Sequence, residues 1–364
     1  RSLKLESLGQ PDVSKKGSKN MSLMKNALKG FAVAAALAVT GASAQAQDVT
    51  LKFHQFLPQQ ANVPKLIIDP WIQRVEEASG GKIKIDHFPS MQLGGKPPEL
   101  IGQVQDGVAD IVWTVLGYTP GRFPQAEVFE LPFMMNNAEA TSRAFWHFAE
   151  ANMFDTDLKD FKILATFVHG PGLIHSNKPI TSVADLNGVK LRAPTRVINQ
   201  MVSGLGATPV GMPVPAIPEA LSKGVIDATV IPWEVTAALK VPELVGNHTE
   251  FGTEALYTTA FVFAMNKQKY EGLSDELKAA LDSQSGADLS ALAGKLMQGA
   301  DAGGREAAAA NGNNIITLTD AQVAEWKEAS SGVATSWVED MNSKGFDGQA
   351  LLDQAKSLIK ENGM

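Results

Sequence analysis

Segments with the two-residue period of a β-strand alternate with segments that have the period of a helix through the first part of the chain. Strands are predicted at 49–56, 82–86 and 109–113, and helices at 63–79 and 97–106. The strand at 109–113 is almost continuously apolar, which is typical of a strand buried on both faces of a parallel sheet. The order strand, helix, strand, helix, strand indicates an α/β fold.

Similar alternation continues beyond residue 160. Further apolar strands are predicted at 161–168, 225–231 and 258–265. The sequence His-Gly-Pro-Gly at 169–172 breaks the first of these strands sharply, which predicts a crossover of the chain between two lobes. Helices rich in alanine and leucine are predicted to follow Ser274, with an interruption at 303–304.

The length of 364 residues is sufficient for two hydrophobic cores, so we expect two domains. The formal net charge of -7 argues against a nucleic-acid partner, because phosphate recognition requires clustered Lys and Arg. The chain has no cysteine, which removes disulfides and thiolate chemistry.

The N-terminal region is predicted to be a targeting segment. Residues 21–46 combine a positively charged start, a short apolar run and small residues at Ala44 and Ala46, which is typical of a cleaved secretory signal peptide. The apolar run is too short for a comfortable membrane span, so an uncleaved anchor is the less favoured alternative. We therefore expect the mature protein to be exported, and we interpret residues 1–20 as an upstream extension.

Arg192 lies at the end of a predicted short strand that Pro194 terminates. Because a strand end is rigid, the planar guanidinium is presented in one orientation and is suited to bind a carboxylate through two parallel hydrogen bonds. The alternative is an ordinary surface arginine at a strand edge. The favoured interpretation is a group that recognises a small organic acid.

The usual catalytic and metal-binding motifs are absent from the sequence. There is no Gly-x-Ser-x-Gly nucleophile elbow and no His-Glu-x-x-His helix. His169 and His175 are the pair that could ligate a metal across the turn at Pro171, although structural histidines are the favoured interpretation. We therefore expect a binding protein without a metal or other cofactor, rather than an enzyme.

Several blocks of the sequence resemble the solute-binding proteins of TRAP transporters (tripartite ATP-independent periplasmic), DctP type. The resemblance covers essentially all of 48–364 and is carried by the blocks at 53–58, 89–95, 130–133, 188–194 and 224–227. It implies a two-lobed periplasmic-binding-protein fold, with a hinge of crossing strands and a long spanning helix. Lobe I is expected to comprise 47–168 and 258–297, and lobe II 169–257 and 298–364.

The resemblance also implies a function in the periplasm. The two lobes would close over a small organic acid, and the loaded protein would deliver it to a membrane permease made of a small and a large subunit. Arg192 matches the family arginine that pairs with the ligand carboxylate. A second arginine found in members that bind sialic acid falls near Gly172, and an asparagine of those members falls at Ile231, which argues against a ligand with many hydroxyl groups.

The aromatic residues at strand ends indicate the kind of ligand. Trp113 and Tyr118 flank a strand end in one lobe, and Trp233 follows a strand end in the other. Flat aromatic walls beside one guanidinium suit an aromatic carboxylate, such as a hydroxybenzoate. For both tryptophans a place in the core is the alternative. His169 and Gln55 are further candidates, for ligand hydroxyl groups.

Three alternatives stay open at this point. The ligand could be a linear dicarboxylate or a sugar acid. The chain could be a secreted enzyme on the same two-lobed scaffold. It could also serve a sensor rather than uptake.

Overall fold

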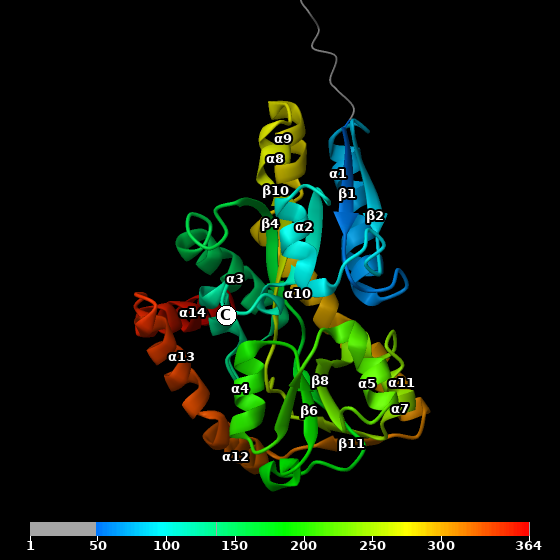
Figure 1. The fold of residues 1–364 in the computed structure, drawn as a ribbon, viewed down its shortest axis with the longest axis vertical. Coiled ribbons are helices and arrows are strands. Elements are labelled where there is room, and N and C mark those ends of the chain that lie inside the picture. Colours follow the sequence, from blue (N-terminus) through cyan, green and yellow to red (C-terminus); the bar gives the residue numbers. More distant parts are fainter. Residues whose placement is uncertain (1–48, 136, 364) are drawn as a thin grey trace, which may run out of the picture. The chain divides into compact units, whose positions relative to one another are not determined.

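The computed structural model describes residues 49–135 and 137–363, which belong to the compact unit formed by residues 46–364. The predicted signal peptide (21–46) and the upstream extension (1–20) lie outside the described residues. Within this unit two α/β halves lie one above the other, each built around its own sheet (Figure 1). The expected two-lobed α/β architecture is therefore confirmed.

The first sheet has five strands in the order β2-β1-β3-β10-β4. The strands are β1 (Val49–His54), β2 (Ile83–Phe88), β3 (Ile111–Val115), β4 (Phe161–Val168) and β10 (Ala260–Asn266). β1 pairs in parallel with β2 and β3, and every residue of β3 is buried, as its apolar sequence predicts. The late strand β10 is inserted antiparallel between β3 and β4, so distant parts of the chain complete one sheet.

The second sheet has six strands in the order β11-β9-β5-β8-β6-β7. The strands are β5 (Gly172–Ser176), β6 (Lys190–Ala193), β7 (Thr208–Gly211), β8 (Ala228–Pro232), β9 (Asn247–Glu250) and β11 (Asn314–Thr317). β6 pairs in parallel with β7 on one side and β8 on the other. The strand that carries Arg192 therefore lies inside the sheet rather than at its edge.

Two antiparallel segments carry the chain between the sheets. Residues 169–171 lead from β4 to β5, and residues 251–259 lead back from β9 to β10. Ala260 pairs with Val168, and Tyr257 forms a bridge with Gly172, so the two segments run side by side. The crossover predicted at 169–172 is therefore confirmed.

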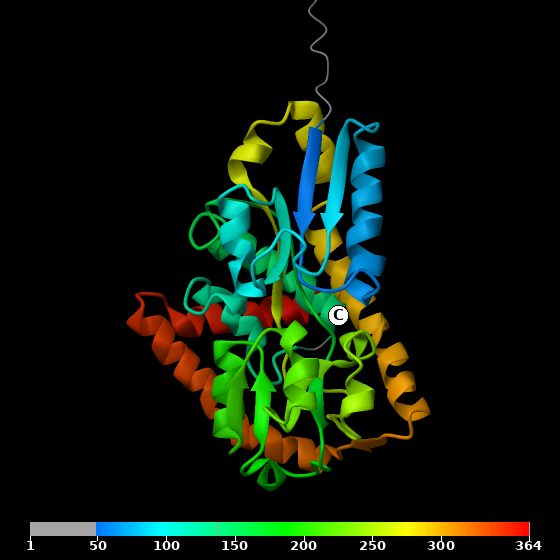
Figure 2. The ribbon, with the colours of Figure 1, turned by 45° about the vertical axis from the view of Figure 1, so that its right-hand side comes forward.

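A long helical connection also joins the two halves. It consists of α10 (Ala287–Gly299) and α11 (Asp301–Ala310). α10 packs against α3 (Ala138–Asn152) of the first half, and α11 packs against α6 (Trp233–Thr236) of the second. Figure 2 shows this connection descending on the right of the molecule.

The interruption predicted at Gly303 and Gly304 is wrong in its position. The two helices are separated at Ala300, and both glycines lie within α11. A Cβ at Gly304 would collide with the backbone carbonyl of Trp233, so this glycine permits α11 to pack closely against α6. Its presence reflects helix packing rather than a helix end.

The remaining helices surround the two sheets. The first half contains η1 (Pro64–Ile68), α1 (Asp69–Ala78), η2 (Pro97–Glu99), α2 (Leu100–Gln105), η3 (Leu116–Tyr118), η4 (Pro124–Glu130), α8 (Lys267–Glu271) and α9 (Asp275–Ser283). The second half contains η5 (Val183–Leu186), α4 (Arg196–Gly204), η6 (Val214–Ala216), α5 (Ile217–Ser222), α7 (Val241–Leu244) and α12 (Asp320–Ser330). The chain ends with α13 (Gly332–Ser343) and α14 (Gly348–Asn362).

The C-terminal helices return toward the first half. α13 packs against α4, and α14 packs against α3. The lobe boundaries predicted from the sequence stay a prediction, and α14, which they assign to lobe II, lies beside a helix of the first half.

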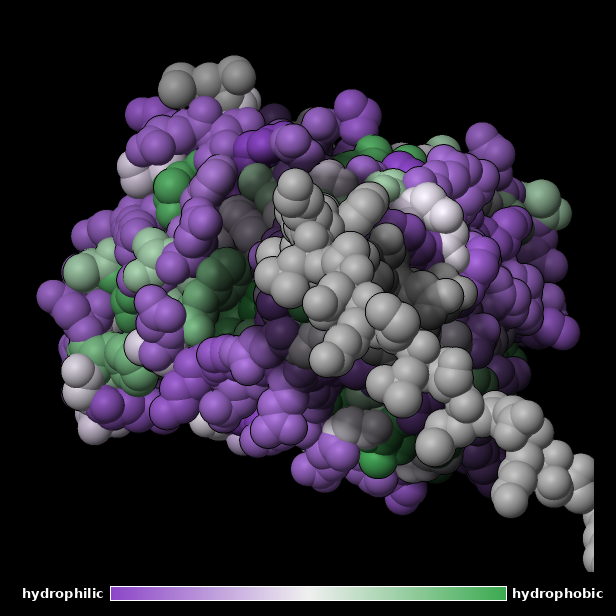
Figure 3. Space-filling view, turned by 90° about the horizontal axis from the view of Figure 1, so that it is seen from above, coloured by the Kyte–Doolittle hydropathy of each residue, from purple (hydrophilic) through white to green (hydrophobic). Residues whose placement is uncertain are grey.

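The surface of the described residues is mainly polar. Hydrophilic residues make up most of the coloured face in Figure 3, with smaller apolar areas between them. The large hydrophobic side chains that are exposed among the described residues are Leu66, Val108, Val225 and Leu292. Within 49–135 and 137–363, every helix is too short or too polar to cross a bilayer.

Candidate functional site

A cavity lies between the two sheets, where strand ends from both halves meet; its empty space, including the part open to solvent, is about 390 Å³. The first half contributes Phe56, Trp113 and Tyr118, and the second half contributes Arg192, Ile231 and Glu234. The crossing segments and β10 contribute His169, Tyr257, Thr259 and Phe261. Most of the wall is therefore aromatic or aliphatic.

Two nitrogens of the Arg192 guanidinium are held by backbone carbonyls, and the third faces no acceptor among the described residues. The Arg192 side chain leaves β6, and the residue is 1% exposed. Nε donates a hydrogen bond to the Met212 carbonyl (2.9 Å), and Nη1 donates to the Val230 carbonyl (3.0 Å). Nη2 is buried and has no hydrogen-bond partner among the described residues. A buried donor without a partner is costly, so this nitrogen is suited to an acceptor supplied by a ligand.

Two tyrosines lie near the guanidinium. Tyr118 follows β3, and its hydroxyl oxygen accepts a hydrogen bond from the backbone N–H of Val214 (3.0 Å). Burial raises the pKa of Tyr118 and of Tyr257, and the charge of Arg192 opposes this rise in both. Both side chains therefore stay neutral phenols, and each can donate a hydrogen bond.

The aromatic wall of the cavity is organised around Trp113. Its ring stacks on Phe56 on one side (4.6 Å between centroids) and on Phe261 on the other (5.2 Å). Trp113 lies in β3, Phe261 in β10 and Phe56 in the turn after β1, so the first sheet positions the three rings. Trp113 Nε1 is buried without a partner among the described residues. Such a wall offers flat apolar surface to a planar ligand.

His169 lies in the first crossing segment with both ring nitrogens engaged. Nδ1 contacts the Gly170 carbonyl (2.6 Å), and Nε2 contacts the Thr259 hydroxyl (3.0 Å). Because a carbonyl accepts but does not donate, Nδ1 carries the proton, and Nε2 accepts from Thr259. Burial lowers the pKa of His169 to about 4, and the charge of Arg192 contributes. The imidazole is therefore neutral at pH 7.

Glu234 brings a carboxyl group to the cavity from the start of α6. The residue is 3% exposed, and its Oε2 is buried without a partner among the described residues. Its backbone is fixed on both sides, since its N–H donates to Asp301 Oδ1 (2.9 Å) and its carbonyl accepts from Asn62 Nδ2 (2.6 Å). Burial, with a smaller contribution from the charge of Asp301, raises the pKa of Glu234 to about 8, and a hydrogen bond with the Asn62 side chain opposes this rise.

The structure brings four of the six residues selected from the sequence to this cavity: Arg192, Trp113, Tyr118 and His169. Their roles in binding stay predictions. The residues that the sequence analysis did not select include Phe56, Glu234, Tyr257 and Phe261. Phe56 ends a predicted strand and Phe261 lies in one. These two residues could therefore have been selected as aromatic residues of apolar strands.

Trp233 and Gln55 lie outside the wall of the cavity. Trp233 is the first residue of α6. Its indole Nε1 donates to Oε1 of Glu250 (2.9 Å), the last residue of β9. The ring packs against His175 and His248 beside a separate surface pocket. Gln55 uses its amide within the turn after β1, where Nε2 donates to the Leu57 carbonyl (2.8 Å).

The two family positions that this chain lacks are filled by apolar groups. A side chain at Gly172 would collide with the ring of Tyr257, so an arginine cannot be placed there without moving this tyrosine. Ile231, where the asparagine was expected, lines the cavity with an aliphatic side chain. In the described residues no group of three or more His, Asp or Glu side chains is arranged to hold a metal ion.

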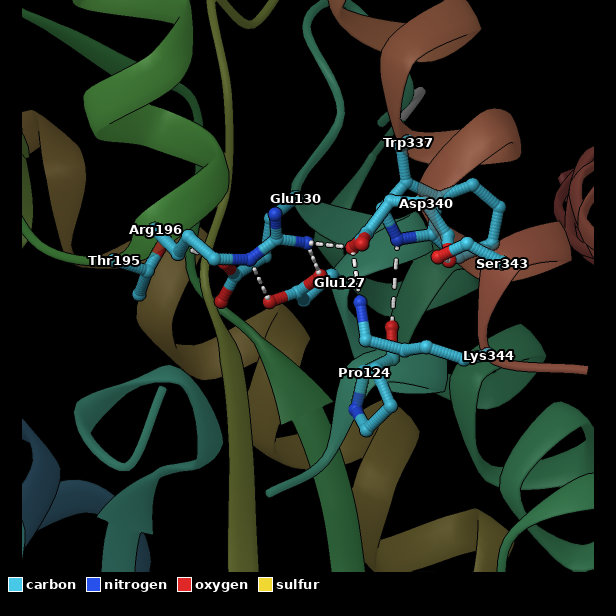
Figure 4. A network of polar contacts seen from close by, with 9 residues as sticks. All are labelled: Pro124, Glu127, Glu130, Thr195, Arg196, Trp337, Asp340, Ser343 and Lys344. Atoms are coloured by element: carbon cyan, nitrogen blue, oxygen red, sulfur yellow. Dashed lines mark hydrogen bonds and ion pairs between the residues drawn. The ribbon is translucent and has the colours of Figure 1, made fainter. Parts of the chain in front are cut away.

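A second polar cluster lies near the cavity, around Arg196 (Figure 4). Arg196, the first residue of α4, donates Nε to Glu127 Oε1 (3.0 Å) and Nη2 to Glu127 Oε2. Nη2 also donates to Asp340 Oδ2 (2.9 Å) on α13, and Asp340 forms a second ion pair with Lys344. Arg196 therefore links η4, α4 and α13.

Glu130 connects this cluster to the crossing strands. It is 1% exposed, and each of its carboxyl oxygens accepts a hydrogen bond. The Thr195 hydroxyl donates to Oε2 (2.6 Å), and the Ala260 N–H donates to Oε1 (3.0 Å). Burial raises the pKa of Glu130 to about 8. This carboxyl group thus joins the end of β6 to the start of β10.

Residues 54–340 match the family model DctP, described as bacterial extracellular solute-binding protein, family 7. A solved TRAP solute-binding protein from Rhodoferax ferrireducens, in complex with copurified benzoate, is 49% identical, with a TM-score of 0.85 over 86% of this chain and 98% of that one. A second, from a marine metagenome and specific for aromatic acid ligands, holds 3-hydroxybenzoate. It is 51% identical, with a TM-score of 0.85 over 87% of this chain and 100% of that one.

A third solved structure is more distant. It is a TRAP periplasmic solute-binding protein from Bordetella bronchiseptica with bound (R)- and (S)-mandelate. It is 27% identical, with a TM-score of 0.80 over 86% of this chain and 99% of that one. All three structures contain a carboxylate attached to, or one carbon from, an aromatic ring.

Proposed function

We propose that this chain, which belongs to the DctP family of bacterial extracellular solute-binding proteins, captures a small aromatic carboxylate in the cavity between its two halves. The observation that carries the proposal is the buried Nη2 of Arg192, which has no partner among the described residues and lies in an aromatic cavity. The three solved relatives that bind benzoate, 3-hydroxybenzoate and mandelate support the same ligand class.

In this proposal the ligand carboxylate accepts hydrogen bonds from Arg192 Nη2 and from a tyrosine hydroxyl at the same end of the cavity. A charge-assisted hydrogen bond contributes about 1.5–3 kcal/mol. The ligand ring lies against the wall of Trp113, Phe56 and Phe261, where burial of apolar area supplies affinity. The guanidinium thus sets the orientation, and the aromatic wall selects a ring.

Closure of the two halves over the ligand is part of the proposal. Two hydrogen bonds at residues of the cavity wall already join the halves, from Asn62 to the Glu234 carbonyl and from the Val214 N–H to Tyr118. A ligand that contacts both halves would favour this closed arrangement, because only differential affinity shifts an equilibrium between open and closed states.

The proposal includes delivery to a TRAP permease with a small and a large subunit and a periplasmic location, and membership of the family supports both. The predicted signal peptide at 21–46 supports export. Uptake rather than sensing is tested by capture of the two membrane subunits on the ligand-loaded protein. Recovery of the ligand unchanged after long incubation would separate binding from an enzymatic reaction.

Titration calorimetry with three acids tests the proposed ligand class. Benzoate is expected to bind with a Kd of about 10 μM or lower. Cyclohexanecarboxylate, which has the same charge but no aromatic ring, is expected to bind about 3- to 10-fold more weakly, because aromatic contacts contribute about 0.5–1.5 kcal/mol. Succinate represents the linear dicarboxylates, and tighter binding of succinate than of benzoate would overturn the proposal.

A further inference from the structure

Glu234 is a polar group of the cavity that the carboxylate and the ring of a simple benzoate do not use. Its Oε2 is buried without a partner among the described residues, and the residue is 3% exposed. The cavity wall around it is apolar, with Pro232, Val235 and Ile231 as lining neighbours. A buried carboxyl oxygen in such surroundings gains free energy when a ligand supplies a hydrogen-bonding group.

The position of this carboxyl group is fixed by its backbone. Asp301 at the start of α11 accepts from the Glu234 N–H, and Asn62 of the first half donates to the Glu234 carbonyl. α11 also packs against the short helix α6 that carries Glu234. The backbone of Glu234 is therefore held by both halves of the molecule and by the spanning helix, which limits the positions that its carboxyl group can take.

The two residues that the sequence suggested for reading a ligand hydroxyl are already engaged. His169 uses Nδ1 with Gly170 and Nε2 with Thr259. Gln55 lies outside the cavity wall, and its amide bonds to Leu57. Trp113 Nε1 has no partner among the described residues; it can donate to a ligand hydroxyl but cannot accept the proton of that hydroxyl. Glu234 is thus the group in the cavity wall that combines an unpartnered oxygen with a carboxyl group.

We infer that Glu234 selects, among aromatic carboxylates, those that carry a hydroxyl group on the ring. This inference rests on the proposed function, because Arg192 must hold the carboxylate for the ring to present its hydroxyl to Glu234. A phenolic hydroxyl both donates and accepts, so it pairs with a carboxyl group in either protonation state. The hydroxyl of the ligand thereby satisfies the buried oxygen that benzoate leaves unpaired.

The electrostatics of the cavity are compatible with this assignment. Burial raises the pKa of Glu234 to about 8, so the carboxyl group is mostly neutral at pH 7. A neutral carboxyl group does not repel the anionic carboxylate bound by Arg192 in the same cavity, whereas an ionised one would.

The test compares the Kd values of benzoate, 3-hydroxybenzoate and 4-hydroxybenzoate by titration calorimetry at pH 7. For the natural sequence we expect at least one hydroxybenzoate to bind about 10-fold or more tightly than benzoate. In Glu234→Met, which removes the hydrogen-bonding group at similar length, this ratio is expected to fall to about 1. Glu234→Gln keeps a hydrogen-bonding group and is expected to retain most of the preference.

Methoxybenzoates provide a second test, which uses the protein with its natural sequence. The 3- and 4-methoxybenzoates cannot donate a hydrogen bond, and we expect each to lose the preference of the matching hydroxybenzoate. Trp113→Phe is the control for the indole N–H and is expected to keep the preference for the hydroxylated acid.

Two results would overturn the inference alone: benzoate binding as tightly as both hydroxybenzoates, or a hydroxyl preference that persists in Glu234→Met. Failure of benzoate and of both hydroxybenzoates to bind the natural sequence would instead remove the proposed function, and the inference with it.

Discussion

Two arginines four residues apart have opposite surroundings. Arg192 at the end of β6 donates to two backbone carbonyls and keeps Nη2 buried without a partner among the described residues. Arg196 at the start of α4 donates to Glu127 through two nitrogens and to Asp340 (Figure 4). Among the described residues, the first guanidinium pairs with no carboxylate, and the second pairs with two.

This difference separates a binding group from a structural group. The cluster of Arg196 satisfies its own hydrogen bonds, as does Glu130 with Thr195 and Ala260, and these contacts join segments far apart in the sequence. The cavity of Arg192 keeps unpaired polar atoms on Trp113 and Glu234 as well. These are three of the eight buried side-chain atoms that have no partner among the described residues. Since unpaired buried groups reduce stability, such atoms in a cavity wall are expected where a ligand completes their hydrogen bonds.

The largest effect is expected for the affinity of the Arg192→Met variant. Removal of the guanidinium deletes charge-assisted hydrogen bonds worth about 3 kcal/mol or more together, so the Kd for benzoate should rise by about 100-fold or more. Arg196→Met is the matched control and should change this Kd by less than about 3-fold. Titration calorimetry of both variants checks the comparison, and equal losses would erase the distinction between the two arginines.

For the free energy of unfolding, we expect the larger effect from Arg196→Met and the smaller one from Arg192→Met. Arg196→Met leaves Glu127 buried without its cation and should lower the free energy of unfolding by about 1–3 kcal/mol. The value is below that of a fully buried pair because 36% of the Arg196 side chain is exposed. Arg192→Met removes a buried cation that lacks a counter-ion and should change stability by less than about 1 kcal/mol. Urea unfolding without ligand measures both, and a greater loss in Arg192→Met would contradict the comparison.

A third effect concerns the pH dependence of stability without ligand. The pKa of Glu234 is about 8 in the folded protein and near 4.5 when unfolded, so between these values the folded state retains a proton that the unfolded state has released. Stability therefore falls as the pH rises from 5 to 8, by up to about 1.4 kcal/mol per pH unit for this group. Glu234→Gln should reduce this slope.

The neighbouring carboxyl groups set the background for that measurement. Glu130, with a pKa of about 8, and Asp301, with a pKa of about 7, contribute slopes of the same sign and remain in the variant. Thermal unfolding of both proteins at several pH values gives the difference. Parallel profiles for the natural sequence and Glu234→Gln would show that Glu234 ionises normally in the folded state.

The smallest effect is expected when the hydrogen bond between Asn62 and the Glu234 carbonyl is removed. Asn62→Ala removes one hydrogen bond of the closed arrangement, worth about 0.5–1.5 kcal/mol. The Kd for benzoate should rise about 3- to 10-fold, mainly through faster dissociation. Stopped-flow measurement of ligand release checks this, and an unchanged release rate would argue against a role of the contact in closure.

Much of the fold could be predicted from local sequence. The apolar strands and the crossover at 169–172 depend on neighbouring residues, which periodicity and turn rules describe. Arg192 could be selected because Pro194 follows it at a strand end. Strands β5, β9 and β11 were not predicted, since their short sequences acquire strand structure from partners distant in the chain.

The composition of the cavity depends on contacts that sequence patterns do not contain. Trp233 was expected in the cavity from its place after a strand, but α6 begins at this residue and its indole bonds to Glu250. Tyr257 reaches the cavity because its segment pairs with Gly172, which lies 85 positions earlier in the chain. The unpaired Nη2 of Arg192 depends on the carbonyls of Met212 and Val230, which engage the other nitrogens.

The most direct test of the central claim is a thermodynamic cycle with two ligands and two proteins. Benzoate and the neutral benzamide are titrated into the natural sequence and into Arg192→Met. If Arg192 binds the carboxylate, the substitution should weaken benzoate by at least about 30-fold more than benzamide, a coupling of about 2 kcal/mol. Equal weakening of both ligands would contradict the account, because the guanidinium would then support the cavity without recognising the charge.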